Sequence, residues 1–123
     1  MNVNYRVIVA GSRSFTDYDL LCRTLDRLLA ARMPDVTIIS GGARGADSLA
    51  EQYAVARGLT VVVYPADWKT HGRAAGPIRN EIMAQNADAL AAFWDGESKG
   101  TADMVSRARQ HGLPVRVIRF NAS

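Results

Sequence analysis

The chain has little cysteine and no apolar run long enough to cross a membrane. Cys22 is its one cysteine, which excludes an intrachain disulfide and a cysteine-based metal cluster. It has no dense Lys/Arg block, so the net charge of +3 suits an anionic ligand better than a long nucleic acid. The start of the chain lacks a charged segment followed by an apolar stretch, and a cytoplasmic protein is therefore expected.

Linkers and low-complexity segments are also absent. A chain of 123 residues can bury a core but has no room for a second one, so we expect a single domain spanning residues 1–123. Its two histidines do not form a metal-binding pair, because His71 falls in a loop after a predicted strand and His111 near a helix end on the other side. We expect neither a metal nor a cofactor.

Short apolar runs alternate with stretches of helical periodicity. Strands are predicted at residues 5–10, 36–39, 60–64, 89–93 and 115–120. Helices are predicted to begin at Thr16, Ala46, Pro77 and Gly100. The last strand carries alternating arginines, which favour the edge of a sheet. Strands that alternate with helices predict an α/β fold, a parallel sheet with helices on both faces.

Local signals support two of the helix starts. Thr16 and Asp19 match a capping box at the first helix. Pro77 fits the first position of the third helix, where its missing N–H costs nothing, and Ile78, Ile82 and Met83 follow on one side.

A glycine-rich segment, residues 40–47 (SGGARGAD), connects the second strand to the second helix. Glycine lets the backbone bend and lets a phosphate approach closely, and a helix N-terminus offers free N–H groups. The segment matches neither GxxxxGK[ST] nor GxGxxG. An anion-binding loop and a purely geometric turn are both consistent with it.

Eight of the ten glycines follow predicted strands, whereas Gly58 and Gly112 end helices. In a parallel sheet these loops share the carboxyl edge, where ligands bind at the topological switch point. The longest irregular segment, residues 65–76, lies at the same edge, and loops of that length are more often functional than idle. This asymmetry predicts a binding cleft on one edge of the sheet.

Arginines and tryptophans occupy the same loops. Arg13, Arg44 and Arg79 suit a phosphate, which arginine can hold in a bidentate manner. Trp68 and Trp94 could stack on a base. Each also has a structural interpretation, since the arginines could pair with nearby acids and the tryptophans could be packing residues.

Four segments in order resemble one known family. They are VIVAGSRSFTD at residues 7–17, SGGARGAD at 40–47, YPADW…GRAAGPIRNEIM at 64–83 and AFWDGESKGT at 92–101. Together they closely resemble the YspA-like, cpYpsA-related branch of the SLOG superfamily. The resemblance implies a Rossmann-like domain that binds nucleotides or nucleotide-derived ligands. Relatives include the LOG enzymes, which cleave the N-glycosidic bond of cytokinin riboside monophosphates, and the DNA-binding DprA/Smf proteins.

The glycine-rich edge and the resemblance together give the predicted ligand-binding residues. They are Gly11, Ser12, Arg13, Ser40, Gly41, Gly42, Arg44, Gly45, Asp47, Trp68, Arg79, Asn80, Trp94, Gly100 and Thr101. The candidate catalytic residues are Arg79, Glu81 and Asp103.

Residues 96–101 resemble the second phosphate loop of LOG enzymes, written PGGxGTxxE, but only Gly100 and Thr101 match it. The glutamate of that motif falls on Met104. Asp103, one residue earlier, has a shorter reach.

Three functions are compatible with these residues. The first is binding of a nucleotide or nucleotide-derived ligand, as a sensor or processing module. The second is a nucleoside-monophosphate N-glycosidase in which Arg79 positions the phosphate or leaving group and Glu81 or Asp103 is the acid. The third is single-stranded DNA binding, which needs a continuous basic track that the modest charge does not favour.

The expected fold includes an order for the strands of the sheet. We expect a three-layer sandwich with a five-stranded parallel sheet in the order 3-2-1-4-5, with 2-1-3-4-5 as the alternative. Since the parent family often self-associates, a homo-oligomer is expected, formed through an exposed helix face.

Overall fold

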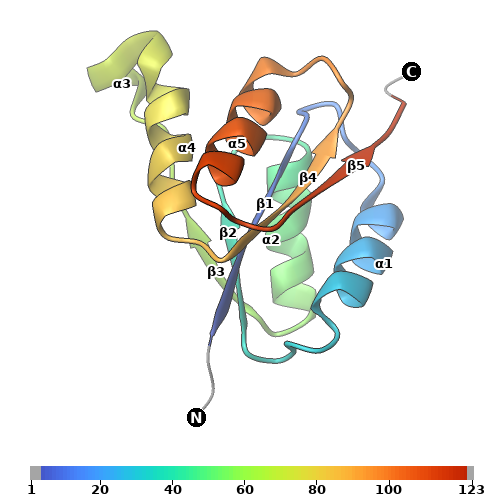
Figure 1. Cartoon of the computed structure of the whole chain (residues 1–123). Helices are drawn as coiled ribbons and strands as arrows, with labels where there is room; N and C mark the ends of the chain where they lie inside the picture. Colours follow the sequence, from blue (N-terminus) through green and yellow to red (C-terminus); the bar gives the residue numbers. More distant parts are fainter. Residues whose placement is uncertain (1–3, 122–123) are drawn as a thin grey trace.

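The computed structural model describes residues 4–121. Its five strands are β1 (Tyr5–Gly11), β2 (Val36–Ser40), β3 (Thr60–Val63), β4 (Ala89–Trp94) and β5 (Val115–Arg119). They form one parallel sheet in the order β3-β2-β1-β4-β5 (Figure 1). The predicted order 3-2-1-4-5 and the α/β class are confirmed, and β5 does lie at an edge.

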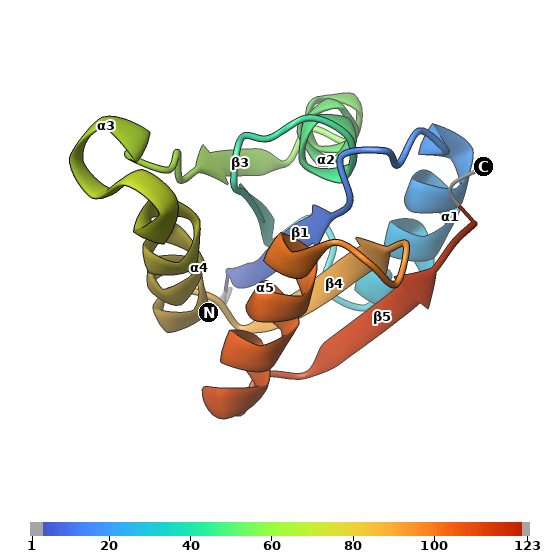
Figure 2. The same cartoon turned by 90° about the horizontal axis from the view of Figure 1, so that it is seen from above.

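Helices cover both faces of the sheet, which gives three layers (Figure 2). On one face lie α1 (Tyr18–Leu29) and α2 (Ala46–Ala56), and on the other lie α4 (Ala75–Gln85) and α5 (Lys99–Gln110). Alternate residues of β1 point to the two cores: Val7 and Val9 pack with α1 and α2, whereas Ile8 packs with α4 and α5. The central strands are mainly apolar because both of their faces are buried.

The first helix begins differently from the prediction. Asp17, not Thr16, caps α1, because the Asp17 Oδ1 accepts the N–H of Leu20 at 2.9 Å. Asp19 lies in the first turn and pairs with Arg23 at 2.9 Å instead of completing a capping box. The predicted Thr16–Asp19 box is therefore wrong, and an aspartate one residue further on takes its place.

The segment predicted as an irregular loop, residues 65–76, is mostly helical. Asp67 caps the short helix α3 (Trp68–His71) by accepting the Thr70 N–H at 3.2 Å. A 3₁₀ turn, η1 (Gly72–Ala74), follows, and α4 begins at Ala75 rather than at Pro77. Pro77 is thus the third helical residue, still in the first turn, where its missing N–H leaves no hydrogen bond unmade.

Helix α4 does not bury all the apolar residues predicted to share one side. Met83 is 2% exposed, but Ile78 and Ile82 are 39% and 41% exposed. These two isoleucines give α4 an exposed apolar face of the kind expected for self-association, which remains a prediction. Among the residues described, no helix has the length and apolar character needed to cross a bilayer.

Candidate functional site

Two adjoining chambers lie at the carboxyl edge of the sheet, where the loops after β1 to β4 meet. The α4–α5 chamber, of about 320 Å³, is lined by the end of β1 and by α4 and α5, with Asn80 and Asp103 among its polar groups. The glycine-loop chamber, of about 340 Å³, is lined by residues 41–44 and the start of the segment after β3. Four residues line both chambers, namely Arg13, Ala43, Trp68 and Arg79.

Most of the predicted site residues line these chambers. Those that line one or both are Gly11, Arg13, Gly41, Gly42, Arg44, Asp47, Trp68, Arg79, Asn80, Gly100, Thr101 and Asp103. Those that line neither are Ser12, Ser40, Gly45, Glu81 and Trp94. The two chambers lie at the edge of the sheet where the glycine pattern predicts a cleft, and five of the proposed residues lie outside them.

Arg79 occupies the boundary between the chambers and is held by backbone and side-chain oxygens. Its Nη1 donates to the Gly41 carbonyl at 2.6 Å and to the Tyr64 carbonyl at 3.5 Å, and its Nε donates to Asn80 Oδ1 at 3.1 Å. Within residues 4–121 no acceptor is assigned to its Nη2 group. Burial lowers the pKa of Arg79, an effect that the nearby Asp47 opposes. The result is an oriented, half-buried cation with donors to spare.

Asp47 lies beneath the glycine loop in the first turn of α2. It is 6% exposed, and its Oδ2 accepts the Ala43 N–H at 3.1 Å. Burial raises the pKa of Asp47, against the effects of the Ala43 N–H and the Arg79 charge. A carboxyl group with a raised pKa in a cavity is a candidate for ligand contact or proton transfer.

Asp47→Asn is expected to stabilise the protein increasingly as the pH rises from about 3 to 7. Since the pKa of Asp47 is higher in the folded protein than in the unfolded chain, ionisation costs stability. The penalty is absent below the unfolded pKa and complete above the folded one. The difference in Tm between variant and wild type, measured by calorimetry at several pH values, should grow in favour of the variant.

Asp26→Asn is the matched control, because Arg57 and the hydroxyl of Tyr53 lower the pKa of Asp26. Its ionisation stabilises the fold, so this variant should lose stability relative to wild type as the pH rises through the same range. Differences that do not change with pH, or that follow the same trend in both variants, contradict the assignment for Asp47.

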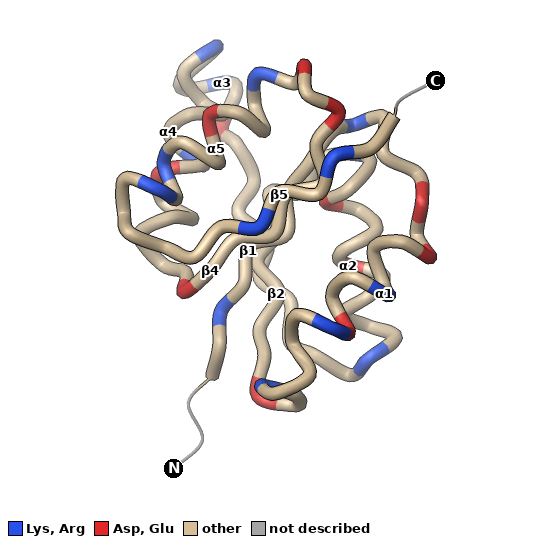
Figure 3. The backbone as a smooth tube through the Cα atoms, turned by 45° about the vertical axis from the view of Figure 1, so that its right-hand side comes forward, with Lys and Arg blue, Asp and Glu red and all other residues tan. Residues whose placement is uncertain are grey.

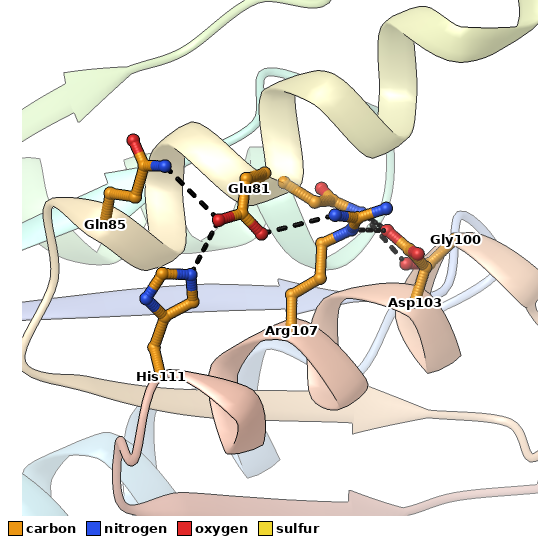
Figure 4. A network of polar contacts seen from close by, with 7 residues as sticks. Glu81, Gln85, Gly100, Asp103, Arg107 and His111 are labelled. Atoms are coloured by element: carbon orange, nitrogen blue, oxygen red, sulfur yellow. Dashed lines mark hydrogen bonds and ion pairs between the residues drawn. The ribbon is translucent and has the colours of Figure 1, made fainter.

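A chain of polar contacts joins α4 to α5 (Figure 4). It ends at Asp103 and Asn80, which line the α4–α5 chamber. Glu81 accepts from Arg107 Nη1 at 3.2 Å and lies 2.7 Å from His111 Nε2. Arg107 Nε donates to Asp103 Oδ2 at 2.9 Å, and Asn80 Nδ2 donates to the same oxygen at 3.0 Å. Because Asn80 Oδ1 accepts from Arg79, the contacts continue from the α4–α5 surface to the chamber boundary.

The two candidate acids, Glu81 and Asp103, occupy different positions along this chain of contacts. Asp103 lines the chamber, whereas Glu81 does not, and His111 and Arg107 lower the pKa of Glu81. Glu81 thus links the two helices and does not line the chamber, while a catalytic role for either acid remains a prediction. Arg107, which the sequence analysis did not single out, holds both carboxylates; only its helical spacing of four residues from Asp103 could have suggested it.

The loop between β4 and α5 is held together by its own side chains. Asp95 Oδ1 accepts the N–H groups of Glu97 and Ser98, both at 2.8 Å, which lowers the pKa of Asp95. The Asp95 N–H donates to the buried Ser12 Oγ at 3.0 Å, so Ser12 fastens this loop to the end of β1. Trp94 donates from Nε1 to the Ser98 carbonyl at 3.0 Å.

The remaining predicted residues outside the chambers also have structural roles. Arg119 stacks on the Trp94 ring at 5.3 Å, on the β5 side of the loop. The Ser40 Oγ donates to Glu51 at 2.8 Å and accepts the Gly42 N–H at 3.1 Å, which shapes the glycine loop from below. Gly45 is the N-cap of α2.

Lys99 lines the α4–α5 chamber but is absent from the predicted ligand-binding set. Its place in the loop after the fourth strand, beside Gly100 and Thr101, was the available signal. Among residues 4–121, no group of three or more His, Cys, Asp or Glu side chains could hold a metal ion.

Known proteins resemble this chain in sequence and in fold. The family described as YspA, cpYpsA-related SLOG family matches residues 5–71. The Gene 61 protein of Mycobacterium phage D29 is 34% identical, over 89% of this chain and 93% of the phage protein.

Two solved structures of DNA processing protein A share the fold. The Helicobacter pylori protein, described in its single-stranded DNA binding mode, has a TM-score of 0.70 at 19% identity, covering 93% of this chain. The Streptococcus pneumoniae protein has a TM-score of 0.72 at 18% identity, covering 92% of this chain. The chain spans only 65% and 50% of these two structures. By its sequence match over more than half its length, the chain belongs to the YspA, cpYpsA-related SLOG family.

Proposed function

We propose that this chain binds a nucleotide or nucleotide-derived small molecule in the two chambers at the carboxyl edge of the sheet. The observation that carries the proposal is the position of Arg79, a half-buried guanidinium held at the boundary of both chambers. Within residues 4–121 its Nη2 group has no hydrogen-bond acceptor. A bound anion would complete the hydrogen bonding of this cation. Family membership supports the same ligand class.

The size and chemistry of the chambers support a small ligand. Each chamber, at about 320 and 340 Å³, falls in the range of small-molecule pockets. Polar groups of Asn80 and Asp103 line the same space as the apolar side chains of Met83 and Met104. A few fixed polar groups beside apolar surface are typical of sites that orient a ligand.

The proposal is tested by a screen of the purified protein against nucleosides, nucleoside mono-, di- and triphosphates, cyclic nucleotides and ADP-ribose. Melting temperatures identify candidates, and isothermal titration calorimetry then gives the stoichiometry. We expect at least one nucleotide to raise the Tm and to bind at one site per chain. The proposal fails if no nucleotide at millimolar concentration shifts the Tm or gives a saturable heat.

A second candidate function, N-glycosidic cleavage of a nucleoside monophosphate, is favoured by the position of Asp103 in the same chamber as Arg79. If it is correct, chromatography will detect free base released from a bound nucleotide, and Asp103→Asn will lose that activity. Glu81→Gln is the matched control and should retain it, because Glu81 does not line the chamber. If a nucleotide binds and no base is released, binding as a sensor remains the proposed function.

Nucleic-acid binding remains the less supported alternative. Lys and Arg are distributed over many elements, with Asp and Glu between them (Figure 3). A long DNA or RNA needs a track of phosphate contacts, and its affinity would fall steeply with salt. The screen therefore includes a short oligonucleotide at two salt concentrations.

A further inference from the structure

We propose that the two chambers divide the ligand, with its phosphate in the glycine-loop chamber and its nucleoside in the α4–α5 chamber. This inference rests on the proposed function and assigns an orientation to the same ligand. It differs from the expectation drawn from the LOG-like motif, which places the phosphate at residues 96–101.

The two chambers share Arg13 and Arg79 but differ in their acidic residues, because Asp47 and Asp103 line the α4–α5 chamber alone. Arg13, Arg44 and Arg79 line the glycine-loop chamber, and no Asp or Glu is among its described lining residues. Arg13 and Arg44 are exposed and form no ion pair with any residue from 4 to 121. Asp47 lies beneath the loop and does not line this chamber, so its three arginines form a site for an anion that carries more than one charge.

The α4–α5 chamber has a mixed character that suits a nucleoside. Asp47 and Asp103 line it together with Arg13, Arg79 and Lys99. A phosphate placed there would therefore lie near two carboxylates as well as near cations. The same carboxylates can accept hydrogen bonds from ribose hydroxyls or from the amino groups of a base. The apolar side chains of Ala10, Met83 and Met104 supply a surface for a base or sugar.

The loop at the start of α5 uses several of its N–H groups internally. Asp95 takes the N–H groups of Glu97 and Ser98, and Ser98 takes those of Thr101 at 3.5 Å and Ala102 at 3.1 Å. No acceptor is found within residues 4–121 for the N–H groups of Lys99 and Gly100, so the carboxylate of Asp95 takes up only part of the donors of this loop.

The glycine loop also uses some of its N–H groups internally, but its chamber keeps its cations. Gly42 donates to Ser40 Oγ and Ala43 donates to Asp47 Oδ2. In this chamber the phosphate contacts would therefore come mainly from arginine side chains. The glycine at position 41 lets Arg79 pass close beneath the loop, because a Cβ there would lie 2.6 Å from Arg79 Nη1.

Two exposed cations distinguish the chambers and form a matched pair. Arg44 lines only the glycine-loop chamber, and Lys99 lines only the α4–α5 chamber. Both side chains are exposed, so Arg44→Gln and Lys99→Gln each remove one positive charge without disturbing the core. At about 0.15 M salt, screening over about 8 Å limits each change to its own neighbourhood.

The experiment measures how much a 5′-phosphate improves binding. Calorimetry gives the Kd of adenosine, guanosine, cytidine and uridine and of their 5′-monophosphates, and the pair with the tightest binding is followed in the variants. We expect Arg44→Gln to reduce the phosphate-dependent gain in affinity by about tenfold. In Lys99→Gln the gain should change by less than about twofold.

The other outcomes overturn the inference. A loss confined to Lys99→Gln places the phosphate at the start of α5, and equal losses in both variants show that the cations act through general attraction. Either result leaves nucleotide binding itself intact, so the orientation alone is wrong. If neither nucleosides nor nucleotides bind the wild-type protein, the proposed function fails and the orientation fails with it.

Discussion

Arg79→Ala is expected to weaken nucleotide binding by about 100-fold, which corresponds to about 2.7 kcal/mol. A hydrogen bond to a charged group contributes about 1.5–3 kcal/mol when its partner is left buried. Arg79 contributes in two ways, because it would contact the anion directly and because its Nη1 holds the Gly41 carbonyl at 2.6 Å. The alanine variant removes both. Calorimetry with the tightest-binding nucleotide gives the change in affinity.

Two further variants serve as controls for Arg79→Ala. Arg109→Ala removes an exposed arginine from α5 that lines neither chamber, and it should leave the affinity within about twofold. Arg79→Lys keeps the charge but cannot reach the Gly41 carbonyl and Asn80 Oδ1 together, so an intermediate loss is expected. If Arg79→Ala and Arg109→Ala have the same affinity as wild type, the ligand does not occupy the chamber boundary.

Gly45→Ala is expected to destabilise the protein by about 3 kcal/mol or more and to lower the Tm by about 10 °C. Gly45 has φ +75° and ψ −126°, a conformation that a residue with a side chain adopts only under strain. A Cβ there would also overlap the carbonyl oxygens of Ser12 and Arg13, lying 2.6 Å from the latter. Both obstacles are backbone atoms, which cannot rotate away. Thermal and urea unfolding measure the loss.

Gly58→Ala is the control for a positive φ without a steric overlap. Gly58 has φ +67°, close to that of Gly45, but nothing lies within 4 Å of a Cβ built on it. Its alanine variant should therefore lose only the cost of the strained conformation, about 1 kcal/mol. Equal losses at the two positions would mean that the contact between the β1 loop and the start of α2 is unimportant.

The fold was predictable because a strand that is buried on both faces has a continuous run of apolar residues in the sequence. The apolar run from Val7 to Ala10 needs a layer on each side of its strand, and the structure supplies α1 and α2 on one side and α4 and α5 on the other. Short helices have a weaker sequence pattern. Helix α3 spans only four residues and depends on the Asp67 cap, so it has no apolar periodicity from which it could be predicted.

The loops of the site were predictable, whereas the directions of individual side chains were not. Arg79 and Glu81 are two residues apart on α4, and residues at that spacing do not face the same way on a helix. Arg79 faces the chambers, so Glu81 turns toward α5. Whether Arg79 or Glu81 would face inward depends on how α4 rotates against α5. That rotation is set by buried contacts such as Met83 and Met104, which are distant in sequence.

The two tryptophans differ in a way that gives the protein its own optical reporter. Trp68 lines both chambers and is 54% exposed, whereas Trp94 is held by the Ser98 carbonyl and covered by Arg119. A ligand that enters the chambers would displace water from the Trp68 indole and change its emission, while the Trp94 signal would remain as a constant background. Intrinsic fluorescence can therefore follow occupancy in real time, without a label.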